Sequence, residues 1–197
     1  MEEWHQKLSY SVHHYVEDVI QTSDGDYIVV GGAGGDPLGG HAVQGKAFIL
    51  RMSEGGGVQW IKRYGIIDTP NNTFWGVVEA DDGGFVLAGE KLQDRNFEFY
   101  DHFWVMKTDA YGDEEWSIES GGNLWDEAQD IVKLSDDSYI VTGKTSLSST
   151  NLNMKVMRVS SSGQILWQNN HGGGNNDTAT GITLSQKIGR ASCRERV

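Results

Sequence analysis

The reactive side chains of this sequence show no spacing that is typical of catalysis. The chain contains one cysteine and six histidines. His13 and His14 are adjacent, and because neighbouring residues of a strand point to opposite faces, the two cannot bind one ion together there. The histidines have no cysteine, aspartate or glutamate at a metal-ligand spacing, and no G-x-S-x-G nucleophile motif is present. We therefore expect no catalytic residue, no metal and no cofactor.

Glycine-rich and acidic motifs are weak candidates for ligand sites. The segment "GGAGGDPLGG" resembles a phosphate-binding loop, but it lacks the Lys-Ser/Thr end and the helix that such loops need. The turns "SDGD" and "ADDGG" resemble calcium loops, but they lack the alternating ligands and the terminal Glu of those loops. Both patterns favour ordinary loops and turns.

An internal repeat decides the fold class. The segments "TSDGDYIVVGG", "ADDGGFVLAGE" and "LSDDSYIVTGK" align, and a second motif follows each: "LRMSEGGGVQW", "MKTDAYGDEEW" and "MRVSSSGQILW". In the second motif a basic residue precedes a glycine by five positions and a tryptophan by nine. We predict structural roles for the recurring residues, with the tryptophans filling the space between neighbouring units. These residues are Trp4, Trp60, Trp116, Trp167, Gly56, Gly112, Gly163, Gly31, Gly89 and Gly143.

Each copy of the repeat is predicted to form four short antiparallel strands. Asp24-Gly25 and Asp82-Gly83 stand between apolar runs, where Asp-Gly pairs are strong hairpin signals. In the middle copy we expect strands at about residues 74–80, 84–90, 102–107 and 114–119. Four strands in a repeat of about 40–50 residues or slightly more are typical of a propeller blade.

We therefore expect an all-β fold, a partial β-propeller in residues 1–186. It has three complete four-stranded blades at about residues 14–65, 72–122 and 126–173. An outer strand precedes them, and the first strand of a further blade follows at residues 177–186. Closed propellers have about 4–8 blades, so we expect further blades of the full-length chain to complete the ring.

The repeat motifs resemble a known family. "DDGGFVLAGE" followed by "VMKTDAYGDEEW" is similar to bacterial and archaeal propeller proteins with DGGYIVAG-type repeats, which are secreted or surface-borne. The second motif also resembles the tryptophan-docking motif of quinoprotein-type blades. Asp109, Gly112 and Trp116 match that motif, whereas the other copies replace the Asp. The resemblance implies an extracellular or cell-surface location, although no signal peptide is visible in this sequence.

The last eleven residues, "KIGRASCRERV", depart from the repeat. They begin where the fourth copy should reach its turn, and they add basic residues to an otherwise acidic chain. Translated back, Ile188 to Val197 resembles a sequencing adapter read in frame, and a genuine basic tail is the alternative. We expect residues 187–197 to be non-native and disordered or poorly packed, with no chemistry at Cys193.

The net charge and the variable loops limit which functions are compatible with this sequence. The formal net charge of -12 argues against nucleic acid as a partner, and no apolar run is long enough to span a membrane. Strand order places the connections 31–46, 90–100 and 144–153 at one end of the units, and these differ between copies. Variable loops on a rigid scaffold commonly carry function. The candidate contacts to a ligand are Asp36, His41, Arg95, Phe97 and Tyr100.

Three functional hypotheses follow from these observations. The first is a non-catalytic module that binds protein or carbohydrate through the variable-loop face. The alternative is a fragment of a propeller enzyme, either a quinoprotein-like oxidoreductase or a polysaccharide-active enzyme, with catalytic residues in other blades. A third possibility is a stalk without a ligand in a long surface protein. Fold alone does not separate them, because propellers host many unrelated activities.

Overall fold

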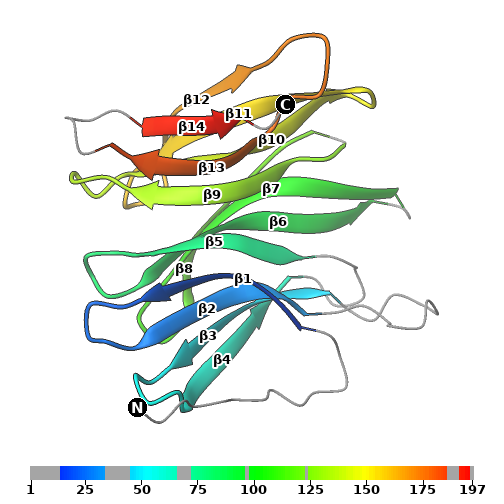
Figure 1. The fold of residues 1–197 in the computed structure, drawn as a ribbon. Coiled ribbons are helices and arrows are strands. Elements are labelled where there is room, and N and C mark those ends of the chain that lie inside the picture. Colours follow the sequence, from blue (N-terminus) through cyan, green and yellow to red (C-terminus); the bar gives the residue numbers. More distant parts are fainter. Residues whose placement is uncertain are drawn as a thin grey trace.

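Every regular element in the described part of the chain is a β-strand (Figure 1). A computed structural model describes residues 14–33, 45–65, 72–95, 98–122, 124–185 and 191–195. All strand pairs in these residues are antiparallel. The predicted all-β antiparallel class is confirmed. No helix that could cross a membrane is found among the described residues.

The strands form three four-stranded units and a two-stranded sheet. Unit 1 contains β1 (His14–Gln21), β2 (Tyr27–Ala33), β3 (Lys46–Met52) and β4 (Val58–Tyr64). Unit 2 contains β5 (Thr73–Glu79), β6 (Phe85–Arg95), β7 (Glu98–Thr108) and β8 (Glu114–Ser120). Unit 3 contains β9 (Glu127–Lys133), β10 (Tyr139–Ser148), β11 (Asn151–Val159) and β12 (Ile165–His171). The two-stranded sheet contains β13 (Ala179–Leu184) and β14 (Ala191–Glu195).

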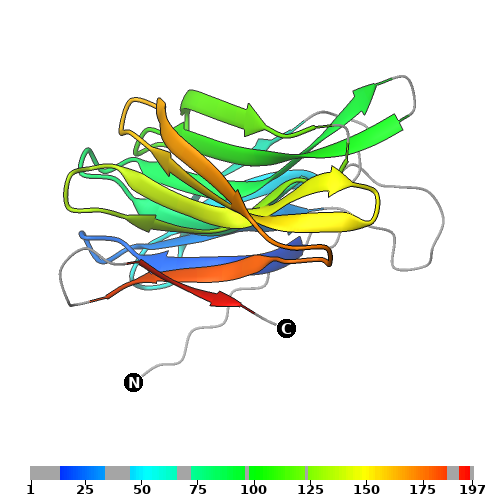
Figure 2. The same cartoon turned by 90° about the horizontal axis from the view of Figure 1, so that it is seen from above.

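Within each unit, consecutive strands pair with one another, so each unit is a meander. Units 1 and 2 are also joined through a single backbone pair, Gly32 with Thr73. The first strands β1, β5, β9 and β13 contact one another in succession. The sheets of the units therefore stack face to face with their first strands on one side, and they overlie one another when seen from above (Figure 2).

Six turns of one type close the strand 1–2 and strand 3–4 hairpins of the three units. In each turn one residue donates its backbone N–H to the residue four positions on and accepts from the residue three positions on. These six residues are Thr22, Ser53, Ala80, Asp109, Leu134 and Ser160. The fourth residue of every turn has a positive φ, and it is Gly in all turns except at Asp137 (φ 62°). The Asp-Gly pairs of two first motifs and the recurring Gly of the second motif indicated turns with positive φ, because Gly adopts positive φ at little cost.

The basic residue of the second motif has a role that the sequence did not indicate. It lies on the third strand of its unit and binds the carboxylate in the turn between the first two strands of the same unit. The three pairs are Arg51–Asp24 (2.5 Å), Lys107–Asp82 (2.6 Å) and Arg158–Asp136 (2.5 Å). The base therefore ties the two hairpins of a unit together.

The glycine that closes each first motif faces a bulge in the first strand. The register of the first and second strands shifts beside Gly31, Gly89 and Gly143. A Cβ atom added at any of these glycines would collide with a backbone carbonyl oxygen of the first strand. Each glycine is therefore required by a close backbone approach.

Two apolar clusters lie between the units and hold the stack together. One joins units 1 and 2 and includes Ile49, Phe74 and Trp104. The other joins units 2 and 3 and includes Phe103 and Met157. Burial of these large side chains supplies the main favourable term for stacking.

The equivalent tryptophans Trp60 and Trp116 pack at the edges of these clusters, each on the turn glycine of the following unit. A Cβ added at Gly112 would lie 3.0 Å from the Trp60 ring, and one at Gly163 would lie 2.8 Å from the Trp116 ring. The Trp116 indole N–H also donates to the carbonyl oxygen of Ser161 at 3.0 Å. The recurring glycine therefore serves both the turn and the indole of the preceding unit. Trp4 lies outside the described residues.

Two regions differ from the sequence-based expectations. Much of the segments 90–100 and 144–153, expected to be loops, continues as paired strand, because polar residues in β6 and β7 and in β10 and β11 pair across their hairpins. Residues 187–197 were expected to be disordered or poorly packed; the backbone of Ala191–Glu195 is ordered in β14, which pairs with β13. Backbone hydrogen bonds to an open strand edge do not depend on side-chain identity, so β13 can recruit this segment. The non-native origin of residues 187–197 stays a prediction.

Candidate functional site

The two ends of the units differ in construction. The six repeated turns form one end. We call the opposite end the hairpin face; it contains the connections between second and third strands and those between units. In unit 2 the β6–β7 hairpin is paired out to Arg95 and Glu98, and in unit 3 the β10–β11 hairpin turns between Ser148 and Asn151. Residues 34–44, which connect β2 to β3, lie outside the described residues.

A repeated backbone contact positions the hairpin face. The residue just before the first strand of a unit donates its backbone N–H to a carbonyl oxygen near the start of the third strand of the preceding unit. The three hydrogen bonds are Asn72 to Gly45 (3.3 Å), Asp126 to Asp101 (3.0 Å) and Asp177 to Leu152 (2.8 Å). Successive units are therefore held in the same relative position at this end.

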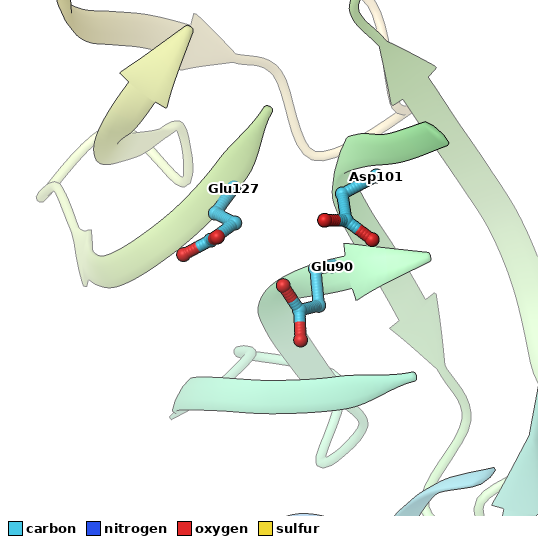
Figure 3. Close-up of side chains that lie close together, drawn as sticks. All are labelled: Glu90, Asp101 and Glu127. Carbon is cyan, nitrogen blue, oxygen red and sulfur yellow. The ribbon is translucent and has the colours of Figure 1, made fainter. Parts of the chain in front are cut away.

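Three carboxylates converge on the hairpin face at the junction of units 2 and 3 (Figure 3). Glu90 comes from β6, Asp101 from β7 and Glu127 from the start of β9. One oxygen from each lies within 4.8 Å of the others. Glu90 is only 8% exposed, whereas the other two are partly buried. We call these residues the carboxylate cluster.

The environment of the cluster favours neutral carboxyl groups. Burial, followed by the negative charges of Glu127 and Asp101, raises the pKa of Glu90 to about 9. Burial and the charge of Glu127 raise the pKa of Asp101 to about 6. The Lys144 ammonium opposes both shifts, and it forms an ion pair with Glu127 at 2.7 Å. Glu90 is therefore protonated at neutral pH.

Further buried polar groups surround the cluster. Asp126 is fully buried; it accepts hydrogen bonds from the Thr145 hydroxyl and from the Gly122 backbone N–H at 2.9 Å. Lys155 is 4% exposed and donates to the Ser120 hydroxyl at 2.7 Å. Burial lowers the pKa of Lys155, and the charge of Asp126 opposes that shift. The junction of units 2 and 3 is therefore polar at the hairpin face and apolar further in.

The cluster has two chemical capabilities. Three carboxylate oxygens at this spacing could bind a hard divalent cation, which prefers oxygen ligands. A carboxyl with a raised pKa beside an ionised one could also act as a general acid and base. Lys144 and the proton on Glu90 already compensate the negative charge, so the cluster by itself identifies no ligand.

The candidate residues from the sequence fall on this face or outside the described chain. Tyr100 lies on β7, pairs with Gln93 and precedes Asp101 of the cluster. Arg95 ends β6 and pairs with Glu98. Asp36, His41 and Phe97 lie outside the described residues. The structure brings Tyr100 next to the cluster in the chain, and it places Arg95 at the far end of the hairpin.

Sequence reasoning missed the carboxylate cluster because its members are distant in the chain and belong to two units. One signal was available. Glu90 and Lys144 occupy the same repeat position, immediately after the closing glycine of the first motif. A charged residue within an apolar repeat strand requires a partner, and opposite charges at this position in consecutive units indicate a contact across the junction.

Comparisons with known proteins do not assign a function. No family model and no curated protein matches the chain. A solved structure that resembles it is a protein of unknown function from Bacteroides caccae, with a TM-score of 0.49 and 14% sequence identity. The match covers 98% of this chain and 64% of that chain, so this chain spans less than two thirds of that protein.

Proposed function

We propose that the three units are blades of a β-propeller-type repeat protein and that the chain is a non-catalytic binding module. Its ligand is a protein or a carbohydrate, which contacts the hairpin face. By the resemblance of its repeats, the module belongs to an exported or cell-surface protein whose further blades complete the ring.

The observation that carries the proposal is the contrast between the two ends. Six turns at one end share a single hydrogen-bond pattern. The hairpin face has unlike connections, a long β6–β7 hairpin and the carboxylate cluster. Identical turns serve the fold, whereas unlike connections on a rigid scaffold are where binding residues gather. Tyr100 supplies an aromatic side chain, a common anchor in binding interfaces, at that face.

Two tyrosines provide a matched test. Tyr100 lies on the hairpin face, whereas Tyr111 lies in a repeated turn at the opposite end and is 72% exposed. The intact chain would be screened against glycan and surface-protein arrays, and Tyr100→Ala and Tyr111→Ala would be compared on each hit. We expect Tyr100→Ala to weaken binding by about tenfold or more, a typical effect for an anchor residue, and Tyr111→Ala to leave it unchanged. The reverse result, or no hit at all, would contradict the proposal.

A polysaccharide-active enzyme is the second candidate, and the carboxylate cluster is the observation in its favour. Glu90 with a pKa of about 9 could serve as an acid beside the lower-pKa Asp101. Retaining glycosidases place two carboxyl groups about 5 Å apart, which the cluster allows. Hydrolysis of labelled oligosaccharides by the intact chain, abolished in Glu90→Gln, would favour the enzyme over the binding module.

A further inference from the structure

The junction of unit 3 with β13 contains buried oxygen atoms that the fold leaves without hydrogen-bond donors. Asn151 and Asn153 lie on the same face of β11, two residues apart. The Oδ1 atoms of both are buried and accept no hydrogen bond. Asn153 is only 8% exposed. A buried carbonyl oxygen that accepts no hydrogen bond lowers the stability of the fold. An electropositive partner, such as a cation, would remove that loss at both Oδ1 atoms.

The two amide oxygens border the loop "GGGNND" of residues 172–177, which connects β12 to β13. Asn151 donates its side-chain N–H to the carbonyl oxygen of Gly173 at 3.2 Å. A Cβ atom added at Gly172 would collide with Asn153 Oδ1 and lie 2.8 Å from Asp177 Oδ2. Asn153 therefore points its free oxygen toward the loop and its carboxylate.

Hydrogen bonds that do not involve the Oδ1 atoms of Asn151 and Asn153 hold the loop 172–177 in place. Asp177 accepts the Gly173 backbone N–H at 2.9 Å and donates its own backbone N–H to Leu152 at 2.8 Å. The Asn176 side-chain oxygen accepts the Leu152 N–H at 3.0 Å. A preformed loop with a carboxylate and free amide oxygens has the ligand types that calcium prefers.

The equivalent junction of units 2 and 3 lacks this arrangement. There Asp126 takes the place of Asp177 and binds the Gly122 N–H in the same way, but the Thr145 hydroxyl occupies its other oxygen. Tyr100 and His102 occupy the positions of Asn151 and Asn153. The two amide oxygens at the junction of unit 3 with β13 therefore have no counterpart at the junction of units 2 and 3.

We propose that Asn151, Asn153 and Asp177 bind a calcium-class divalent cation together with carbonyl oxygens of the loop 172–177. The Asn153 and Asp177 oxygens are no more than about 5 Å apart, as two ligands of one calcium ion must be. One carboxylate and several neutral oxygens make a site of low charge, so the affinity is in the range of weak extracellular calcium modules, about 0.1–1 mM. The bound ion ties the β12–β13 connection to β11 on the hairpin face.

The proposal is tested by calcium titration of the intact chain, using isothermal calorimetry and thermal unfolding with calcium or EDTA. We expect calcium to bind and to raise the unfolding temperature. Asn153→Ala and Asp177→Asn should each weaken binding at least tenfold. Asn169→Ala, on the exposed strand β12, should leave it unchanged. No calcium binding up to 10 mM, about ten times the upper end of that affinity range, would overturn the proposal, as would binding that responds only to Glu90→Gln.

Asn153→Asp separates a cation site from an amide that simply donates to Asp177. If a cation binds, the added charge should tighten calcium binding about tenfold, and calcium should restore the stability of the variant. If the Asn153 amide donates to the carboxylate instead, two carboxylates would repel each other and calcium would have no effect. That second result would overturn the proposal, and circular dichroism would confirm that the variant is folded.

Discussion

Trp116 and Trp167 occupy the same position of the repeat but have different surroundings. Trp116 packs on Gly163 of the following unit, donates its indole N–H to Ser161 and contacts the apolar cluster between units 2 and 3. Trp167 follows the same second motif in unit 3 and remains 39% exposed. Beyond it, the described chain provides β13 and β14 but no third-to-fourth strand turn on which an indole could rest.

Backbone contacts are nevertheless alike at the two junctions. Asp126 and Asp177 make the same backbone hydrogen bond to the preceding unit. At the junction with β13, the Asp130 side chain also accepts the Ile182 N–H at 2.7 Å. The comparison teaches that the first strand of a unit suffices to set its position. Burial of the tryptophan requires the outer strands as well. Hydrogen bonds therefore align the units, and apolar packing supplies most of the stability of a completed junction.

The largest expected effect tests this division directly. Trp116→Ala should lower the free energy of unfolding by about 3 kcal/mol, since it removes an aromatic side chain packed at a cluster. Trp167→Ala should change it by less than about 1 kcal/mol, because the ring is already partly in solvent. Urea unfolding of the two variants beside the parent chain measures both values. Equal losses would contradict the comparison.

The pH dependence of stability tests the polar part of the junction between units 2 and 3. The pKa of Glu90 is about 9 in the folded chain, above its ordinary value of 4.5. At pH values between these two pKa values, Glu90 is protonated in the folded chain and ionised in the unfolded chain. Folding therefore takes up a proton, and stability falls as the pH rises. Glu90 accounts for at most about 1.4 kcal/mol of this fall per pH unit.

Glu90→Gln should remove the part of that fall that is due to Glu90. The amide resembles the protonated carboxyl group, so the variant should be more stable than the parent at pH 6 and nearly equal at pH 4, with a difference of about 2 kcal/mol between the two conditions. Urea unfolding at several pH values provides the measurement, and Glu54→Gln, in an exposed turn, is the control. A stability difference between parent and Glu90→Gln that does not change between pH 5 and pH 8 would show that Glu90 is ionised.

Two turn glycines separate backbone strain from the contact with tryptophan. Gly25 and Gly163 both have positive φ, 93° and 81°. A Cβ at Gly25 meets nothing within 4 Å, whereas one at Gly163 would lie 2.8 Å from the Trp116 ring. Gly25→Ala should cost about 1 kcal/mol for the left-handed conformation. Gly163→Ala should cost about 1 kcal/mol more for the displaced indole, and adding Trp116→Ala should cancel the extra loss.

The smallest effect is expected at an exposed ion pair between units 1 and 2. Lys62 contacts Asp113 at 2.7 Å, and the two side chains are 38% and 70% exposed. Lys62→Met keeps the aliphatic stem and removes the charge, so the free energy of unfolding should change by less than about 0.5 kcal/mol. A larger, salt-dependent change in urea unfolding would mean that charge as well as packing stabilises the stack.

The all-β class, the repeat and the turn positions could be predicted because each depends on a few neighbouring residues. Asp-Gly pairs and the glycine five positions after the base identify turns with positive φ. The lengths of β6 and β7 could not be predicted, because the polar residues of segment 90–100 are ordinary in a loop and become strand only when paired across the hairpin. Intrinsic β-propensity predicts a strand poorly where pairing with a neighbouring strand decides whether the strand forms.

The candidate sites divide in the same way. The sequence by itself determined which end of the units varies, since strand order alone separates the repeated turns from the unlike connections. Only the tertiary structure decided that Glu90, Asp101 and Glu127 meet, that Asn153 faces Asp177, and that Trp116 is covered while Trp167 is not. These contacts join residues of different strands and units, and no local pattern specifies which side chains the stacking of sheets brings together.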